Sequence, residues 1–99
     1  MVSELDIKDN EFLRQFELHS NGEMARIEYS LQERKIFLTK IEVPETLKKD
    51  GYSDYFIEAV FDIIKERKIS LVPTCSEITS FVRNNRRKYK SLLPVGINI

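Results

Sequence analysis

The segment of residues 45–53 combines features suited to phosphate binding. Two lysines, Lys48 and Lys49, come just before Gly51, and a helical apolar pattern begins at Tyr52. Free backbone N–H groups at a helix start attract anions, and a glycine lets the preceding turn adopt a positive φ. The segment lacks the several glycines of a P-loop or of a dinucleotide-binding fingerprint. From the spacing alone, a phosphate cradle and a plain charged turn are both open.

A second candidate for chemistry is Cys75, the sole cysteine of the chain. The pattern Thr74-Cys75-Ser76-Glu77 predicts a capping box, in which Thr74 caps a helix and Glu77 bonds back to it. The helix dipole would then stabilise a thiolate on Cys75, as a nucleophile requires. The alternative is a small buried apolar side chain, the usual role of a free cysteine. The sole histidine, His19, lies far upstream, so we expect no Cys–His pair and no metal site.

Three predicted strands precede these segments. Residues 12–19 mix apolar and charged side chains and run into Asn21-Gly22, a dipeptide typical of a tight hairpin turn. Residues 24–31 alternate cleanly, as in a half-buried antiparallel strand. In residues 34–43, apolar side chains occur at both even and odd positions. This pattern predicts a central strand covered on both faces, and Pro44 ends it.

Helix and strand alternate in the second half of the chain. Helical apolar spacing predicts a helix over residues 52–67, and a β-branched run predicts a strand over residues 69–72, closed by Pro73. Ile78, Phe81 and Val82 give the next helix an apolar face. A strand–helix–strand order favours a right-handed crossover onto a parallel neighbour. We therefore expect an α+β fold, an α/β sandwich of order β-β-β-α-β-α, in which antiparallel strands precede a parallel one.

Length and composition fit one compact domain. The 99 residues are 41% hydrophobic and 32% charged, with 16 basic and 16 acidic residues. We expect a single domain over residues 1–99, with loosely ordered tails at 1–10 and 94–99. No apolar run approaches the length of a membrane span, and the acidic first residues lack the layout of a signal peptide. We therefore expect a cytoplasmic monomer without a membrane partner.

The zero net charge hides an uneven distribution. Acidic residues end at Glu77, and five basic residues crowd into the stretch that follows, namely Arg83, Arg86, Arg87, Lys88 and Lys90. A polyanion would be drawn to this end of the chain. A solvated helix end is the simpler interpretation, because basic side chains complement the negative pole of a helix.

Three motifs follow one another in a recognisable order. Residues 38–44 read LTKIEVP, residues 47–53 read LKKDGYS and residues 72–76 read VPTCS. This set resembles the minimal single-domain branch of the GNAT superfamily, the GCN5-related N-acetyltransferases, over residues 12–93. In that family a strand ending in Glu-Val-Pro leads to a phosphate-binding loop and later to a Pro-x-Cys junction between a strand and a helix.

The resemblance implies that the protein binds acetyl-CoA and transfers the acetyl group to an unidentified amine. It implies that the residues that bind the cofactor are Glu42, Val43, Lys48, Lys49, Asp50, Gly51, Tyr52 and Ser53. The strand end would bind the pantetheine arm and the loop would bind the pyrophosphate. The implied catalytic residues are Cys75, which would face the thioester, and Lys40, which stands where many relatives carry a proton-accepting histidine.

Two other functions stay open. Asp50 beside the phosphates, and a lysine in place of a neutral base, favour a module that binds coenzyme A with little or no turnover. A basic second helix is superficially similar to a helix-turn-helix that binds nucleic acid. The strand predicted between the two helices does not fit the tight turn of that motif, so we expect no nucleic-acid partner.

Overall fold

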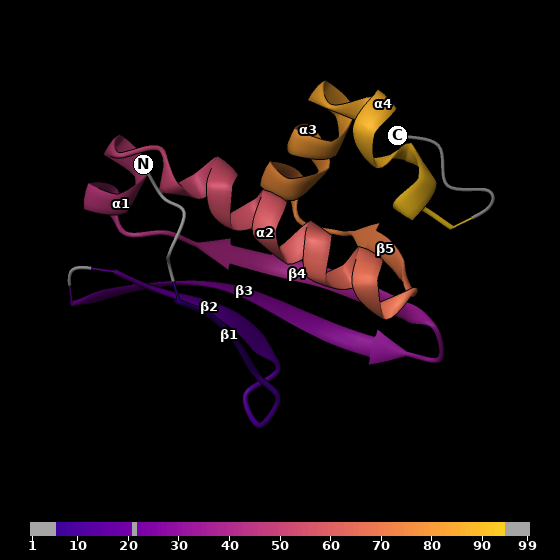
Figure 1. Ribbon diagram of the computed structural model, residues 1–99, viewed down its shortest axis with the longest axis horizontal. Helices are drawn as coiled ribbons and strands as arrows, with labels where there is room; N and C mark the ends of the chain where they lie inside the picture. Colours follow the sequence, from indigo (N-terminus) through magenta and orange to yellow (C-terminus); the bar gives the residue numbers. More distant parts are fainter. Residues whose placement is uncertain (1–5, 21, 95–99) are drawn as a thin grey trace.

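The computed structural model describes residues 6–20 and 22–94, which form a five-stranded sheet with helices on one side (Figure 1). The strands are β1 (Asp6–Asn10), β2 (Gln15–Ser20), β3 (Glu23–Gln32), β4 (Lys35–Glu42) and β5 (Ser70–Pro73). The helices are α1 (Glu45–Lys49), α2 (Tyr52–Arg67), α3 (Ser76–Asn84) and α4 (Arg86–Tyr89), followed by the 3-10 turn η1 (Lys90–Leu92). Strands β1 to β4 pair antiparallel in chain order, and β5 pairs parallel with β4. The predicted α+β class and the parallel strand after a helical crossover are confirmed.

The core lies between the sheet and α2. Its fully buried side chains include Phe16, Leu18, Ala25, Ile27, Ile36 and Leu38 from the sheet and Phe56, Val60, Phe61 and Ile64 from α2. The ring of Phe61 meets those of Tyr89 and Phe81 edge-on, with centroids 4.8 and 5.8 Å away. These contacts hold α3 and α4 against α2, so one apolar layer supports all three helices. In the described part of the chain, no helix is both long and apolar enough to span a membrane.

The predicted hairpin joins β2 to β3, whose register pairs Ser20 with Glu23. Gly22 has a φ of 76°, in the left-handed region that glycine favours. Asn21, the other residue of the predicted turn, lies outside the described residues.

Strand β1 corrects the prediction that residues 1–10 form a loose tail. Its register with β2 runs from the Asp6–His19 pair to the Asn10–Gln15 pair. The sequence of β1 is mostly polar and short, so its strand character comes from backbone pairing with β2 rather than from an apolar alternation. Of the two expected tails, residues 1–5 and 95–99 lie outside the described residues.

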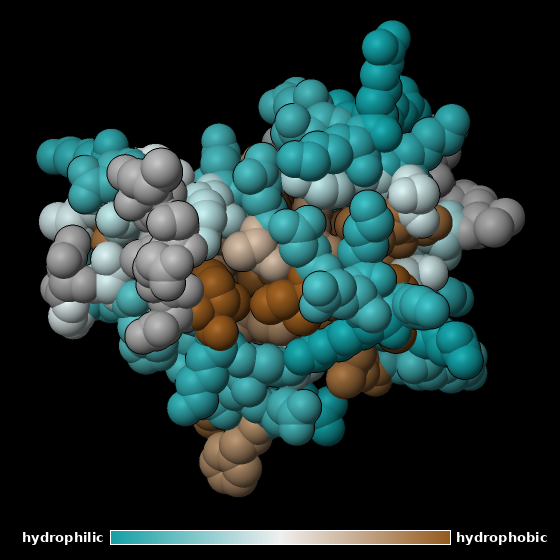
Figure 2. All heavy atoms as spheres, in the orientation of Figure 1, coloured by the Kyte–Doolittle hydropathy of each residue, from teal (hydrophilic) through white to brown (hydrophobic). Residues whose placement is uncertain are grey.

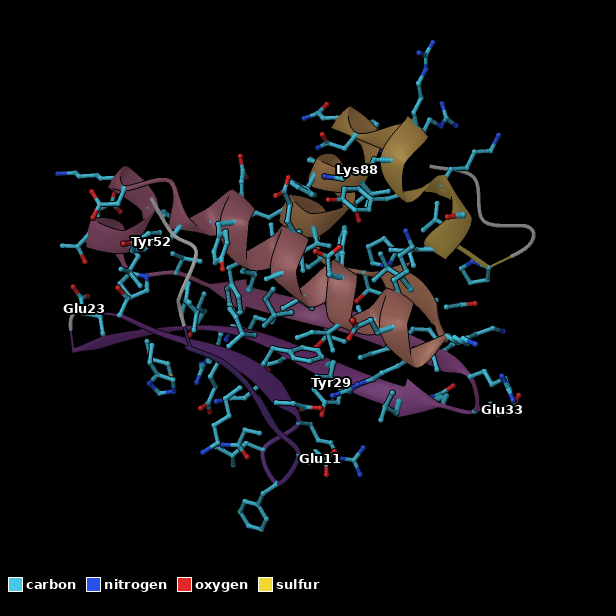
Figure 3. The ribbon with its side chains drawn as sticks, viewed as in Figure 1. Glu11, Glu23, Tyr29, Glu33, Tyr52 and Lys88 are labelled. Atoms are coloured by element: carbon cyan, nitrogen blue, oxygen red, sulfur yellow. The ribbon has the colours of Figure 1, made fainter. Side chains whose placement is uncertain are left out.

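Helix α1 corrects the loop expected between Pro44 and the long helix. Pro44 is the residue before this helix, and its carbonyl accepts hydrogen bonds from the N–H groups of Leu47 and Lys48, both at 3.0 Å. Proline suits a helix start because its fixed φ is already helical and its missing N–H is not needed there. Leu47 is buried and anchors the short helix, while the hydroxyl of Thr46 donates to Glu23 at the start of β3 (Figure 3).

A polar cluster ties the far end of α2 to the first strand. Asp9 accepts a hydrogen bond from the hydroxyl of Tyr29 at 2.6 Å and one from the guanidinium of Arg67 at 2.7 Å. Burial, together with the hydrogen bond to Asp9, raises the pKa of Tyr29 well above its usual range. Arg67 also lies over the ring of Phe16, 5.7 Å from its centroid. One carboxylate therefore links β1, β3 and α2.

We predict that Asp9→Ala destabilises the fold by about 1–3 kcal/mol, because the buried hydroxyl of Tyr29 loses its acceptor. Urea denaturation measures this change. The matched control is Glu11→Ala, an exposed acid two residues away, which should change the free energy of unfolding by less than about 0.5 kcal/mol. Equal effects of the two substitutions would show that the Asp9 contacts contribute nothing.

Gly51 precedes α2 with a φ of 81°, and a Cβ placed there would meet no atom within 4 Å. We predict that Gly51→Ala costs about 1–2 kcal/mol through backbone strain alone. Gly51→Asn should cost less, because asparagine tolerates the left-handed region. Urea denaturation of both variants is the check, and an asparagine variant no more stable than the alanine one would contradict this explanation.

Candidate functional site

The sheet splits where β4 and β5 part. Their parallel pairing starts at Lys35–Ser70 and ends at Leu38–Pro73. There the carbonyl of Leu38 accepts two hydrogen bonds from Thr74, one from its N–H and one from its hydroxyl, both at 3.1 Å. Beyond this point β4 continues to Glu42, while the chain after Thr74 turns away into α3. The edge of β4 past Leu38 therefore faces a gap instead of a neighbouring strand.

A cleft of about 480 Å³ lies beside the end of β4, between the starts of α2 and α3. Its lining residues are Ile41 from β4, Ser53, Asp54 and Ile57 from α2, and Ser76, Glu77, Ser80, Phe81, Asn84 and Asn85 from α3 and its end. Small-molecule sites typically have volumes of about 300–1,000 Å³ and mix apolar walls with a few polar groups. The cleft fits this description in size, although its lining is more polar, with Ile41, Ile57 and Phe81 as its apolar residues.

A bulge in β4 decides which side chains reach the cleft. The register with β3 pairs Lys40 with Glu28 and Leu38 with Tyr29, so Thr39 is an extra residue. Because of this extra residue, Leu38 and Ile41 both point to the helical side and are both buried. The prediction that the strand is covered on both faces was therefore wrong, because helices cover one face of the sheet among the described residues (Figure 1). The bulge explains why Ile41 follows Leu38 on the helical side despite the odd spacing.

The start of α2 supplies one wall of the cleft. Gly51 is the residue before the helix, and no side chain caps the helix N-terminus. Of the residues implied for the phosphate loop, Ser53 lines the cleft. Lys48 and Lys49 lie in the last turn of α1 with exposed side chains, and Asp50 ends that helix. Tyr52 is half-buried against the core, at the same end of the sheet as Glu23 (Figure 3).

The start of α3 supplies the facing wall and corrects the predicted capping box. Cys75, not Thr74, is the residue before the helix, and it has extended backbone geometry. The hydroxyl of Thr74 bonds to Leu38 instead, because the end of β5 holds it beside that carbonyl. Cys75 is half-buried against the core and is not among the lining residues, whereas its neighbour Ser76 is.

The opposite face of the sheet carries a chain of ion pairs. Glu42 binds the guanidinium of Arg26 at 2.6 Å and the ammonium of Lys40 at 3.1 Å. A hydrogen bond from Lys40, together with the charge of Arg26, lowers the pKa of Glu42. A second hollow of about 300 Å³ lies beside these groups and is lined by Met24, Arg26, Glu42, Val43 and Pro44. The structure therefore places the side chain of Lys40 on the face away from the cleft.

Several cleft residues escaped the sequence analysis. Ser76, Ser80 and Asn84 stand four residues apart, which places them on one face of a helix. Polar side chains at this spacing could have indicated a helix face turned toward a cavity. Ile41 had no such signal, since only the bulge turns it toward the helices. Among the residues that the structure describes, the charged side chains of the cleft are Asp54 and Glu77, and no basic side chain lines it.

Comparison with known proteins agrees with this architecture. Residues 15–92 match the family described as GCN5-related N-acetyl-transferase. The match begins at β2 and ends in η1, so it includes every element that lines the cleft. A search of curated proteins finds no match for the chain. A family match over so much of the sequence shows that the chain belongs to the GCN5-related N-acetyltransferase family.

Proposed function

We propose that the protein binds acetyl-CoA in the cleft between α2 and α3 and transfers the acetyl group to an amine. The observation that carries the proposal is the cleft of about 480 Å³ at the parting of β4 and β5, in a chain of this family. The cleft is bounded by the two helix starts that the sequence motifs singled out. Its position ties the ligand to the β5-side edge of β4, where residues 6–20 and 22–94 supply no neighbouring strand after Leu38.

The residues at the end of β4 fit the arm of the donor through their backbone. The side chain of Glu42 lies on the opposite face and that of Val43 packs against the core, so these residues would bind the pantetheine amides with main-chain N–H and C=O groups. An extended ligand can pair with a free strand edge as an added strand would. Ile41 and Ile57 supply apolar contact for the methylene groups of the arm.

The start of α2 has features that both favour and oppose binding of the pyrophosphate. The uncapped N–H groups of the first turn favour an anion, and Gly51 keeps the approach open because no side chain blocks it. Asp54 opposes an anion there, since its carboxylate also lies in the first turn. Lys48 and Lys49 would offset that charge from the end of α1, and the N–H groups of Tyr52 and Ser53 would bind the phosphate oxygens.

The donor would supply an acetyl group activated as a thioester. Acetyl transfer forms a C–N bond to the amine, breaks the C–S bond, and moves one proton from the amine to the leaving thiolate or to water. The protein would lower the barrier by orienting the two reactants and by aiming backbone N–H groups at the developing oxyanion. We assign Cys75 to a position beside the cleft, next to its lining residue Ser76, and Lys40 to holding Glu42 at the end of β4, and we infer direct transfer.

We predict that acetyl-CoA at about 100 times its dissociation constant stabilises the protein by about 2.7 kcal/mol, since the ligand binds only the folded state. A thermal-shift titration measures this. Ser80→Trp, which fills the cleft, should abolish the shift. Ser91→Trp, an exposed serine outside the cleft, should leave it intact.

The result that would contradict the proposal is a wild-type protein that acetyl-CoA does not stabilise, or a shift that survives Ser80→Trp. Stabilisation without acetyl transfer to any amine in a panel of primary amines would instead identify a module that binds coenzyme A. Binding and turnover are therefore measured on the same preparation.

Direct transfer predicts that Cys75→Ser lowers the rate of acetyl transfer by less than about tenfold, because serine keeps the size and position of the side chain without providing a thiolate. Mass spectrometry of the wild-type protein, incubated with acetyl-CoA and no amine, should show no acetyl adduct on Cys75. An acetylated Cys75 together with an inactive serine variant would establish a covalent route.

A further inference from the structure

A basic groove adjoins the cleft at its outer end. This groove of about 390 Å³ lies at the junction of α3 and α4 and is lined by Arg83, Asn84, Asn85, Arg86, Arg87 and Lys88. Asn84 and Asn85 also line the cleft, so the two hollows are neighbours. The hydrophilic surface over α3 and α4 is visible in Figure 2.

The two hollows differ in the sign of their charge. In the described part of the chain, the cleft has the carboxylates of Asp54 and Glu77 and no basic side chain, whereas the groove has four basic side chains and no acidic one. For a ligand that spans both hollows, the groove is therefore the better place for an anionic end group. Helix α3 has nine residues and so a length of roughly 13 Å, which separates the parting of the strands from the groove.

Two of the arginines are available to a ligand. Arg83 and Arg87 are exposed, and neither has an ion-pair partner among residues 6–20 and 22–94. Lys88 differs, because its ammonium lies 3.8 Å from Glu58 and 5.4 Å from the centroid of the Tyr89 ring (Figure 3). The nearby hydroxyl oxygen of Tyr89, together with the carboxylate of Glu58, raises the pKa of Lys88.

The frame beneath the groove is fixed by buried contacts. Tyr89 is 3% exposed, and its ring packs edge-on against Phe61 of α2. The side-chain amide of Asn85 donates to the carbonyl of Phe81 at 2.9 Å, which holds the corner between α3 and α4. Arg83 and Arg87 therefore project from an anchored corner and would lose little freedom of the backbone on binding.

We propose that Arg83 and Arg87 bind the terminal phosphate of the donor, the 3′-phosphate on the ribose of coenzyme A. The proposal rests on the proposed function and adds the site of the nucleotide end. A phosphate monoester carries a charge of about −1.5 to −2 near neutral pH, and planar guanidinium groups bind such groups with paired hydrogen bonds. The thioester would lie at the parting of β4 and β5, and the nucleotide would lie across Asn84 and Asn85.

The test compares acetyl-CoA with acetyl-dephospho-CoA, which lacks only this phosphate. Wild-type protein should bind acetyl-CoA about tenfold more tightly at low ionic strength, by titration calorimetry, and the preference should shrink at high salt. The double variant Arg83→Gln/Arg87→Gln should bind both donors alike, within about twofold. Its affinity for acetyl-dephospho-CoA should stay at the wild-type value.

The matched control is Lys8→Gln/Lys65→Gln, which removes two exposed positive charges from β1 and the end of α2. It should keep the tenfold preference, which separates a local contact from a change in net charge. Circular dichroism should show the same melting transition for both double variants, because all four side chains are exposed.

A double variant that keeps the preference for acetyl-CoA would overturn the assignment of Arg83 and Arg87. Loss of duplex DNA binding in that variant, with the preference retained, would show that the groove is a nucleic-acid surface. Wild-type protein that binds neither donor would overturn the proposed function as well. Wild-type protein that binds both donors equally would overturn the phosphate site alone.

Discussion

The cleft depends on the two hydrogen bonds that Thr74 donates to the carbonyl of Leu38, because β4 and β5 separate directly after them. Up to Leu38, β4 and β5 pair as parallel strands, and after Leu38 β4 continues without β5 beside it. The same threonine directs the chain out of the sheet into α3, so the outgoing helix becomes a wall of the gap. Because buried backbone groups require partners, the free edge that results is suited to an extended ligand rich in amides.

Because of the extra residue Thr39, the end of β4 has an apolar side chain on one face and charged side chains on the other. Ile41 points toward the helices and contributes an apolar wall to the cleft. Lys40 and Glu42 point to the open face, where Glu42 joins Lys40 to Arg26. A regular strand would have kept every second side chain on one face throughout. The bulge therefore keeps a row of charges out of the space that we assign to the thioester.

Local patterns predicted the elements with strong periodicity but could not predict contacts that depend on distant partners. Helix α2 begins and ends where the apolar spacing of residues 52–67 indicates, since its buried face is continuous in sequence. Strand β1 was missed because its polar sequence becomes a strand only beside β2. The capping box failed because Thr74 has a better-placed acceptor across the sheet in Leu38. The order of the motifs identified the family, whereas the charges that line the cleft and the groove required the fold.

The central claim is that the donor lies at the parting of β4 and β5, along α3. The most direct measurement is a titration of the ¹⁵N-labelled protein with acetyl-CoA, followed by amide chemical shifts in two-dimensional NMR. This placement of the donor predicts that the amide signals of residues 39–43, 51–54 and 76–85 shift with one common dissociation constant, while those of β1 and β2 do not shift. Shifts confined to β1 and β2, or no change in residues 76–85, would contradict it.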